Sequence, residues 1–83
     1  MLKVSVISPE NVLFEGDVSS VVAPAFDGEI GILEGHAPLM TLLGKGPLRL
    51  GGASNDKKFE IEGGFLQVVN NVVRIVTEKA TAA

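Results

Sequence analysis

The sequence predicts an all-β fold, and three observations lead to that prediction. Turn-forming residues recur about every 8–12 residues, and the segments between them are rich in β-branched side chains. No window shows the sustained i, i+3, i+4, i+7 apolar spacing of a packed helix. The 83 residues suffice for one domain, and because 46% of them are hydrophobic, they favour a packed globule over a disordered chain.

In the first part of the chain, short strands alternate with turns. Strands are predicted over residues 2–7, 12–15 and 18–23. The turn at 8–11 follows from its proline and from Ser and Asn side chains, which bond back to the local backbone. A second turn is expected at Gly16-Asp17. Pro24 is expected to end the third strand, because proline cannot donate a hydrogen bond to a sheet.

The segment 27–43 is the most distinctive part of the chain. It contains a turn at Asp27-Gly28, a short strand, a second turn at 34–36 and another apolar strand, and it holds the only histidine. Glu29 and His36 are expected near opposite ends of the short strand. Charged, glycine-rich turns beside apolar strands are typical of a binding surface.

The remaining residues continue the same pattern. Strands are predicted over residues 48–50, 58–62, 65–69 and 72–77. Residues 44–47 are expected to form a tight connection, residues 53–56 an exposed hairpin loop, and Gly63-Gly64 a break. Asn70-Asn71 is a plausible two-residue turn, since asparagine tolerates positive φ. Residues 78–83 have a helix-favouring composition but are too few to form a stable helix.

Charge and composition exclude several classes of function. The net charge is −3 and the only basic pair is Lys57-Lys58, so no basic stripe is available for nucleic acid. The absence of cysteine excludes disulfides, thiolate nucleophiles and cysteine-based metal sites. No apolar run approaches the ~20 residues needed to span a bilayer, and no signal or transit peptide is recognisable. We expect a soluble protein, or one attached to a membrane through other proteins.

The residues give little support for catalysis or metal binding. A triad around His36 is left open, because serines occur at positions 5, 8, 19, 20 and 54, but nothing in the sequence points to one. One histidine with scattered carboxylates falls short of a zinc ligand set. The i, i+2 pair of Glu60 and Glu62 is best explained as solvated charge on an outer strand face. Residues 44–46 lack the further glycine and the Ser or Thr of a phosphate-binding loop.

The segment 27–43 also has a purely structural explanation. Gly28, Gly31 and Gly35 are most simply positions where a turn or close strand packing excludes a Cβ atom. His36 alone is more often a hydrogen-bonded loop residue, and Glu29 a solvated turn charge. Composition and spacing therefore give binding only a modest advantage at these positions.

A family resemblance changes this balance. Residues 27–41, Asp-Gly-Glu-Ile-Gly-Ile-Leu-Glu-Gly-His-Ala-Pro-Leu-Met-Thr, closely resemble the signature of the ε subunit of F-type ATP synthases. Residues 6–10, 62–68 and 71–75 resemble other strands of that family, so the resemblance covers nearly the whole chain. It implies a flattened β-sandwich of about ten strands in two sheets, comprising residues 1–83 as the amino-terminal domain of an ε subunit.

The resemblance also implies a function and a set of contacts. The family's domain is a non-catalytic rotor part of the central stalk, which binds the γ subunit and the c-ring and couples proton-driven rotation to ATP synthesis. By motif position, Ser8, His36 and Thr41 are expected to bind γ, and Glu29 with Gly31 to meet the c-ring loops. Gly31 and Gly35 would keep that surface flat. No metal, cofactor or nucleic acid is expected.

The resemblance also bears on the chain end and on location. Typical ε chains continue into two carboxy-terminal helices, whereas this sequence stops at Ala83. Inhibition by those helices and ATP binding are therefore not expected of this chain. The expected location is the cytoplasmic face of a bacterial inner membrane, peripheral and held there through the synthase complex. The alternatives are a stand-alone β-sandwich module that binds a peptide or ligand, and a small hydrolase built around His36.

Overall fold

A computed structural model describes residues 1–52 and 56–82 of the chain. These residues form ten strands, and the prediction of an all-β fold is confirmed. The strands are β1 (Leu2–Ile7), β2 (Val12–Val18), β3 (Ser20–Ala25), β4 (Gly28–Leu33), β5 (Leu39–Leu42), β6 (Lys45–Gly51), β7 (Lys57–Glu62), β8 (Phe65–Val69), β9 (Val72–Val76) and β10 (Lys79–Ala82).

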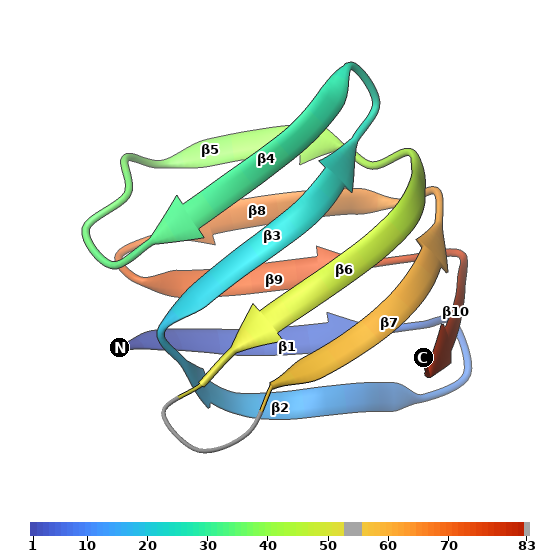
Figure 1. The fold of residues 1–83 in the computed structure, drawn as a ribbon, viewed down its shortest axis with the longest axis horizontal. Helices are drawn as coiled ribbons and strands as arrows, with labels where there is room; N and C mark the ends of the chain where they lie inside the picture. Colours follow the sequence, from blue (N-terminus) through green and yellow to red (C-terminus); the bar gives the residue numbers. More distant parts are fainter. Residues whose placement is uncertain (53–55, 83) are drawn as a thin grey trace.

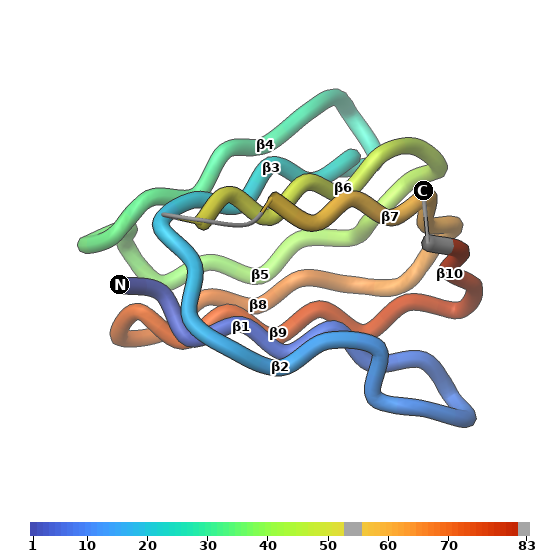
Figure 2. The backbone as a smooth tube through the Cα atoms, turned by 60° about the horizontal axis from the view of Figure 1, so that its bottom comes forward, coloured from blue at the N-terminus to red at the C-terminus, as the bar shows by residue number. Residues whose placement is uncertain are grey.

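The strands form two five-stranded sheets stacked face to face (Figures 1 and 2). Sheet A has the order β2-β1-β9-β8-β5, and sheet B has the order β10-β7-β6-β3-β4. Neighbouring strands are antiparallel except β1 and β9, which run parallel. The molecule measures 27 × 26 × 20 Å, so the predicted flattened sandwich of two sheets is confirmed.

Alternation along the strands places one set of side chains between the sheets. In β1, for example, Leu2, Val4 and Val6 are buried while Lys3 points outward. The core contains Leu2, Val4, Val6, Val18, Leu66, Val68, Val73 and Ile75 from sheet A, and Val21, Ala23, Ile32, Leu48, Leu50, Phe59 and Ile61 from sheet B. This core holds the two outer faces in a fixed relation.

Two predicted interruptions in the first half of the chain are wrong. Gly16 and Asp17 continue β2 rather than forming a turn. A Cβ atom at Gly16 would lie 3.3 Å from the Phe14 ring, so this glycine makes room for an aromatic side chain on the same strand face. Pro24 lies inside β3 and pairs with Glu29. The carbonyl of Pro24 accepts a hydrogen bond from Gly44 N, and the nitrogen of a strand residue points to the same side as its carbonyl. On that side, pairing between β3 and β6 has already ended at Val22, so no strand needs a hydrogen bond from Pro24.

Two predictions in the second half also need correction. Residues 45–47 belong to β6 instead of a tight connection, because they pair with residues 60–62 of β7. The segment after Glu78 forms β10, although its composition favours helix, because residues 79–82 complete the ladder along β7. The Asn70-Asn71 turn has both residues at positive φ, as expected. Most of the predicted 53–56 loop lies outside the described residues.

Three chain passages between the sheets meet at one corner of the sandwich, which we call the corner cluster: residues 43–44, 63–64 and 77–78. Leu43 N donates to Gly64 O at 2.9 Å, and Gly63 N donates to Gly44 O at 3.2 Å. The buried Thr77 hydroxyl lies 3.0 Å from the carbonyl oxygens of Gly63 and Lys79. The backbone of the cluster is thus held from all three passages.

Gly64 is the tightest point of this cluster. Its φ is +104°, a conformation that favours glycine, and a Cβ atom would lie 1.9 Å from the carbonyl oxygen of Val76. The backbone of Gly64 therefore contacts the backbone of Val76 and Thr77 directly, with no side chain between them. This contact explains why glycine occurs at the predicted break at Gly63-Gly64.

Candidate functional site: two outer faces of the sandwich

The outer face of sheet B presents the first group of predicted site residues. Glu29 and Gly31 lie on the edge strand β4, where Ile32 points into the core and both of them point outward. They pair with Pro24 and Val22 of β3. The structure therefore brings the predicted c-ring residues together on one exposed face.

Gly31 has no structural reason to be a glycine. A Cβ atom there would meet nothing within 4 Å, and its φ is not positive. The close-packing explanation is therefore wrong at this position, whereas Gly28 and Gly35 do adopt positive φ at turns. Because a strand glycine lowers stability by about 0.5–1 kcal/mol relative to alanine, its presence favours close approach by another molecule.

The outer face of sheet A carries an apolar row that the sequence reading did not identify. Cross-strand pairs link one residue from each of its five strands, and all five are hydrophobic. The apolar row comprises Val12, Ile7, Val76, Phe65 and Leu42. Its two ends, Val12 and Leu42, are 60% and 63% exposed. The other face of sheet A already supplies the core, so the fold does not need these outward apolar side chains. An exposed apolar row of this kind is typical of a protein-binding surface.

The predicted γ-binding residues are spread around sheet A. His36 follows the end of β4, in the turn that Gly35 ties to Asn71 just before β9, whereas Ser8 follows β1 at the opposite end of the sheet. Thr41 lies in β5 opposite the buried Leu66, so it faces the sandwich interior and is half-buried. The structure does not bring these three residues into one cluster.

Hydrogen bonds fix the turn that carries His36. Its backbone N–H donates to Leu33 O at 3.1 Å, and Gly35 N donates to the side-chain oxygen of Asn71 at 2.7 Å. The Glu34 carboxylate pairs with the amino group of Met1 at 2.5 Å. The hydrogen bond from this amino group, together with its positive charge, lowers the pKa of Glu34 from its ordinary value.

The imidazole of His36 has no catalytic neighbours among the residues described. Its Nδ1 atom lies 2.7 Å from the carbonyl oxygen of Ala37, an arrangement that suits a protonated Nδ1 donating to the backbone. Within the described ranges, no serine hydroxyl or carboxylate forms a hydrogen bond with the ring. The arrangement is that of a structural loop histidine.

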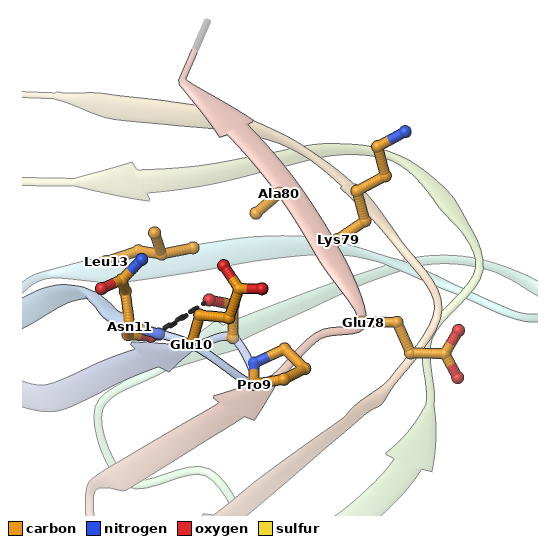
Figure 3. Close-up of a pocket in the computed structure, with 8 residues that line it drawn as sticks. Pro9, Glu10, Asn11, Leu13, Glu78, Lys79 and Ala80 are labelled. Atoms are coloured by element: carbon orange, nitrogen blue, oxygen red, sulfur yellow. Dashed lines mark hydrogen bonds between the residues drawn. The ribbon is translucent and has the colours of Figure 1, made fainter.

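Ser8 borders a hollow of about 280 Å³ between the β1–β2 turn and β10 (Figure 3). The Ser8 hydroxyl accepts a hydrogen bond from Asn11 N at 3.2 Å, so it is committed to the turn. The sides of the hollow include Glu10 from that turn and Lys79 from β10. Because the sequence did not predict β10, it did not predict this hollow.

Two features are absent from the described residues. Residues 1–52 and 56–82 contain no group of three or more His, Cys, Asp or Glu side chains placed to hold a metal ion. Over the same ranges, no helix is both long and apolar enough to traverse a membrane.

Comparison with known proteins gives a consistent result. The family model for the ATP synthase delta/epsilon chain β-sandwich domain matches residues 1–83. An ATP synthase epsilon chain from Leptospira borgpetersenii is 47% identical over 77 residues, covering 93% of this chain and 61% of that protein. One from Caulobacter vibrioides is 39% identical over 82 residues, covering 99% and 95%. The chain thus spans about three-fifths of the length of the Leptospira relative and nearly the whole length of the Caulobacter one.

A solved structure has the same fold. A chain in the Euglena gracilis mitochondrial ATP synthase assembly, described as OSCP/F1/c-ring, superposes with a TM-score of 0.90 at 24% identity. The match covers 98% of this chain and 52% of that one. Together these comparisons confirm the resemblance inferred from the residue 27–41 motif and the sandwich architecture.

Proposed function

The chain belongs to the delta/epsilon chain β-sandwich family of ATP synthases, and on that premise we propose that it is a central-stalk domain that binds the γ subunit and the c-ring. In this role it couples proton-driven rotation to ATP synthesis without catalysing a reaction itself. The two sequence relatives named above, from Leptospira and Caulobacter, are bacterial, which supports a location on the cytoplasmic face of a bacterial membrane, within the synthase complex.

The apolar row on sheet A is the observation that supports γ binding best. Val12 and Leu42 expose about three-fifths of their surface, with the half-buried Ile7, Val76 and Phe65 between them. Burying one such side chain against a partner contributes roughly 1.5–3 kcal/mol. A subunit that is always covered in its complex can retain a surface of this kind, whereas a free domain would gain solubility by losing it.

The edge strand β4 supports c-ring contact on the other sheet. Glu29 offers an exposed carboxylate, and Gly31 beside it leaves the backbone accessible. A basic side chain on a polar loop of the ring could pair with Glu29, contributing about 0.2–1 kcal/mol if the pair stays exposed. Because Glu29 and the apolar row lie on opposite layers, the domain could hold both partners at the same time.

The test for γ binding compares two exposed leucines on opposite layers. Leu42 and Leu33 are 63% and 64% exposed, on the outer faces of sheets A and B. We expect Leu42→Gln to weaken the complex with the purified cognate γ subunit at least tenfold in calorimetry, and Leu33→Gln to change it less than twofold. No complex with the unaltered chain, or equal losses in both variants, would refute the assignment and favour a stand-alone module.

The test for c-ring contact uses charge reversal. We expect Glu29→Lys to reduce ATP-driven proton pumping in membranes carrying the assembled synthase, while thermal unfolding of the isolated chain stays unchanged. Glu78→Lys is the matched control, because Glu78 is also exposed but lies in the passage before β10. Unchanged pumping in the Glu29 variant would remove this residue from the proposed contact.

A further inference from the structure

The outer face of sheet B contains a pair of like charges that the fold itself does not explain. Arg49 of β6 and Lys58 of β7 are direct cross-strand partners, and both are exposed. Like charges placed directly opposite each other destabilise a sheet. Elsewhere in the same ladder opposite charges pair, as in Lys45 with Glu62. The Arg49–Lys58 pair is thus an exception within its own ladder.

The neighbours of this pair do not neutralise it. Along the same cross-strand row, Arg49 is followed by Val22 of β3 and then by Gly31 of β4, neither of which is charged. Across residues 1–52 and 56–82, neither Arg49 nor Lys58 takes part in a salt bridge. Within β7, the acid on the same strand face is Glu60, two residues from Lys58, and its direct cross-strand partners are Pro47 and Thr81.

A hollow of about 460 Å³ lies beside the pair. Its sides include Arg49, Lys58 and the adjacent Lys57, with uncharged residues such as Val22 and Gly51. Among the described residues that line it, the one acid is Asp56, whose carboxylate accepts a hydrogen bond from Gly52 N at 3.3 Å. The charged lining residues therefore sum to +2, three cations against one carboxylate, on a chain whose net charge is −3.

This charge distribution suits an anion. The Arg49 guanidinium and the Lys58 ammonium lie on one strand face beside a shallow, partly apolar hollow and offer several donors to one phosphate group. Lys57 alternates to the other strand face, so it adds positive charge at the border of the hollow. The hollow also opens on the same outer face as Glu29, two strands away from β4. If Glu29 meets the c-ring loops, as proposed above, this face is turned toward the membrane that holds the ring.

We propose that the hollow formed by Arg49, Lys57 and Lys58 binds the phosphate groups of anionic lipids at the membrane surface beneath the complex. This inference rests on the proposed function only for the orientation of the face. It adds a direct contact with the bilayer to the indirect attachment through γ and the c-ring. Basic side chains near an anionic bilayer attract it within about a Debye length, so the contact should weaken as salt is raised.

The test is sedimentation of the purified chain with vesicles at low ionic strength. Vesicles of phosphatidylglycerol and phosphatidylcholine are compared with vesicles of phosphatidylcholine alone. We expect binding only to the anionic vesicles, and we expect Arg49→Gln/Lys58→Gln to weaken it roughly thirtyfold. Lys3→Gln/Arg74→Gln is the matched control, because it removes the same charge from exposed positions on the outer face of sheet A. We expect that control to retain most of the binding.

Three results would overturn the proposal: no binding to anionic vesicles, equal binding to both vesicle types, or equal losses in the two double variants. The γ complex provides an independent readout, because Arg49→Gln/Lys58→Gln leaves sheet A intact and should bind γ as the unaltered chain does. A chain that binds γ but not anionic vesicles loses only the lipid site. A chain that binds vesicles as described but not γ loses only the proposed stalk function.

Discussion

Thr77→Val is expected to destabilise the domain while changing almost nothing in its shape. Thr77 is 1% exposed, and its hydroxyl is close to three carbonyl oxygens, those of Glu62, Gly63 and Lys79, at 3.4, 3.0 and 3.0 Å. A hydroxyl carries one proton, so it donates one strong hydrogen bond at a time. Valine keeps the β-branch and the volume but places a methyl group against these oxygens.

The magnitude follows from that single bond. Leaving a buried carbonyl without its donor costs about 1–3 kcal/mol. The whole domain should be stable by only about 4–12 kcal/mol, from roughly 0.05–0.15 kcal/mol per residue. For a chain of this size, each kcal/mol lowers Tm by about 4–8 °C, so we expect a decrease of roughly 10 °C.

Urea unfolding followed by circular dichroism would measure this change. We expect a lower midpoint with an unchanged m value, because the surface exposed on unfolding stays the same. Thr77→Ser is the control, since it keeps the hydroxyl and removes only a methyl group, and it should recover most of the hydrogen-bond contribution. A valine variant as stable as the unaltered chain would show that the hydroxyl does not stabilise the corner cluster.

Two further expectations concern glycine and pH. Gly64→Ala should lower the free energy of unfolding by at least about 3 kcal/mol or prevent folding, because its Cβ would overlap Val76 O. Gly31→Ala should leave the free energy of unfolding unchanged or raise it by about 0.5–1 kcal/mol. Urea unfolding midpoints of both variants test this. The pKa of Glu34 is lower in the folded state than its ordinary value near 4.5, because the carboxylate pairs with the Met1 amine. This pairing stabilises the fold at pH values above the ordinary pKa, and the stabilisation is lost as pH falls through the lower folded-state pKa. Tm of the chain and of Glu34→Gln should differ slightly at pH 7 and differ less at pH 3, and a difference that does not decrease between these pH values would contradict this assignment.

Strand positions were predictable wherever alternation was regular and the turn was local. The segment 58–62 alternates Phe59 and Ile61 with charged residues, and β7 buries those two. The Asn70-Asn71 turn needs only two residues that tolerate positive φ. Local chemistry determines both features, so both can be read from the sequence.

The errors occurred where a distant partner decides the conformation. β10 is a strand because the edge of β7 offers a ladder, and nothing within residues 79–82 indicates that. Gly16 accommodates a ring, and Pro24 is tolerated only because pairing with β6 has stopped. Composition alone cannot distinguish these cases from a turn and a strand end.

The candidate site was predictable in part. Glu29 and Gly31 were assigned to one contact by motif position, and the structure places both on the outer face of β4, while the contact itself stays a prediction. The apolar row was missed because its members come from five strands and meet only through their register. The sequence did contain one signal of the apolar row. Two consecutive apolar residues occur in each of two strands, at Phe65-Leu66 and at Val72-Val73, so both faces of these strands are apolar. A sheet with one solvated face needs apolar residues on only one of its faces.

The corner cluster has a mechanical consequence for a domain loaded on two faces. The chain passes between the layers five times, and three of those passages are hydrogen-bonded to one another at a single corner. The other two, at Ser19 and at residues 34–38, lie at the opposite end of the sheets. Opposed tangential forces on the outer faces would make the layers pivot about the corner rather than slide. The elastic deformation would then fall on the two passages at the far end, Ser19 and the loop 34–38 that carries His36.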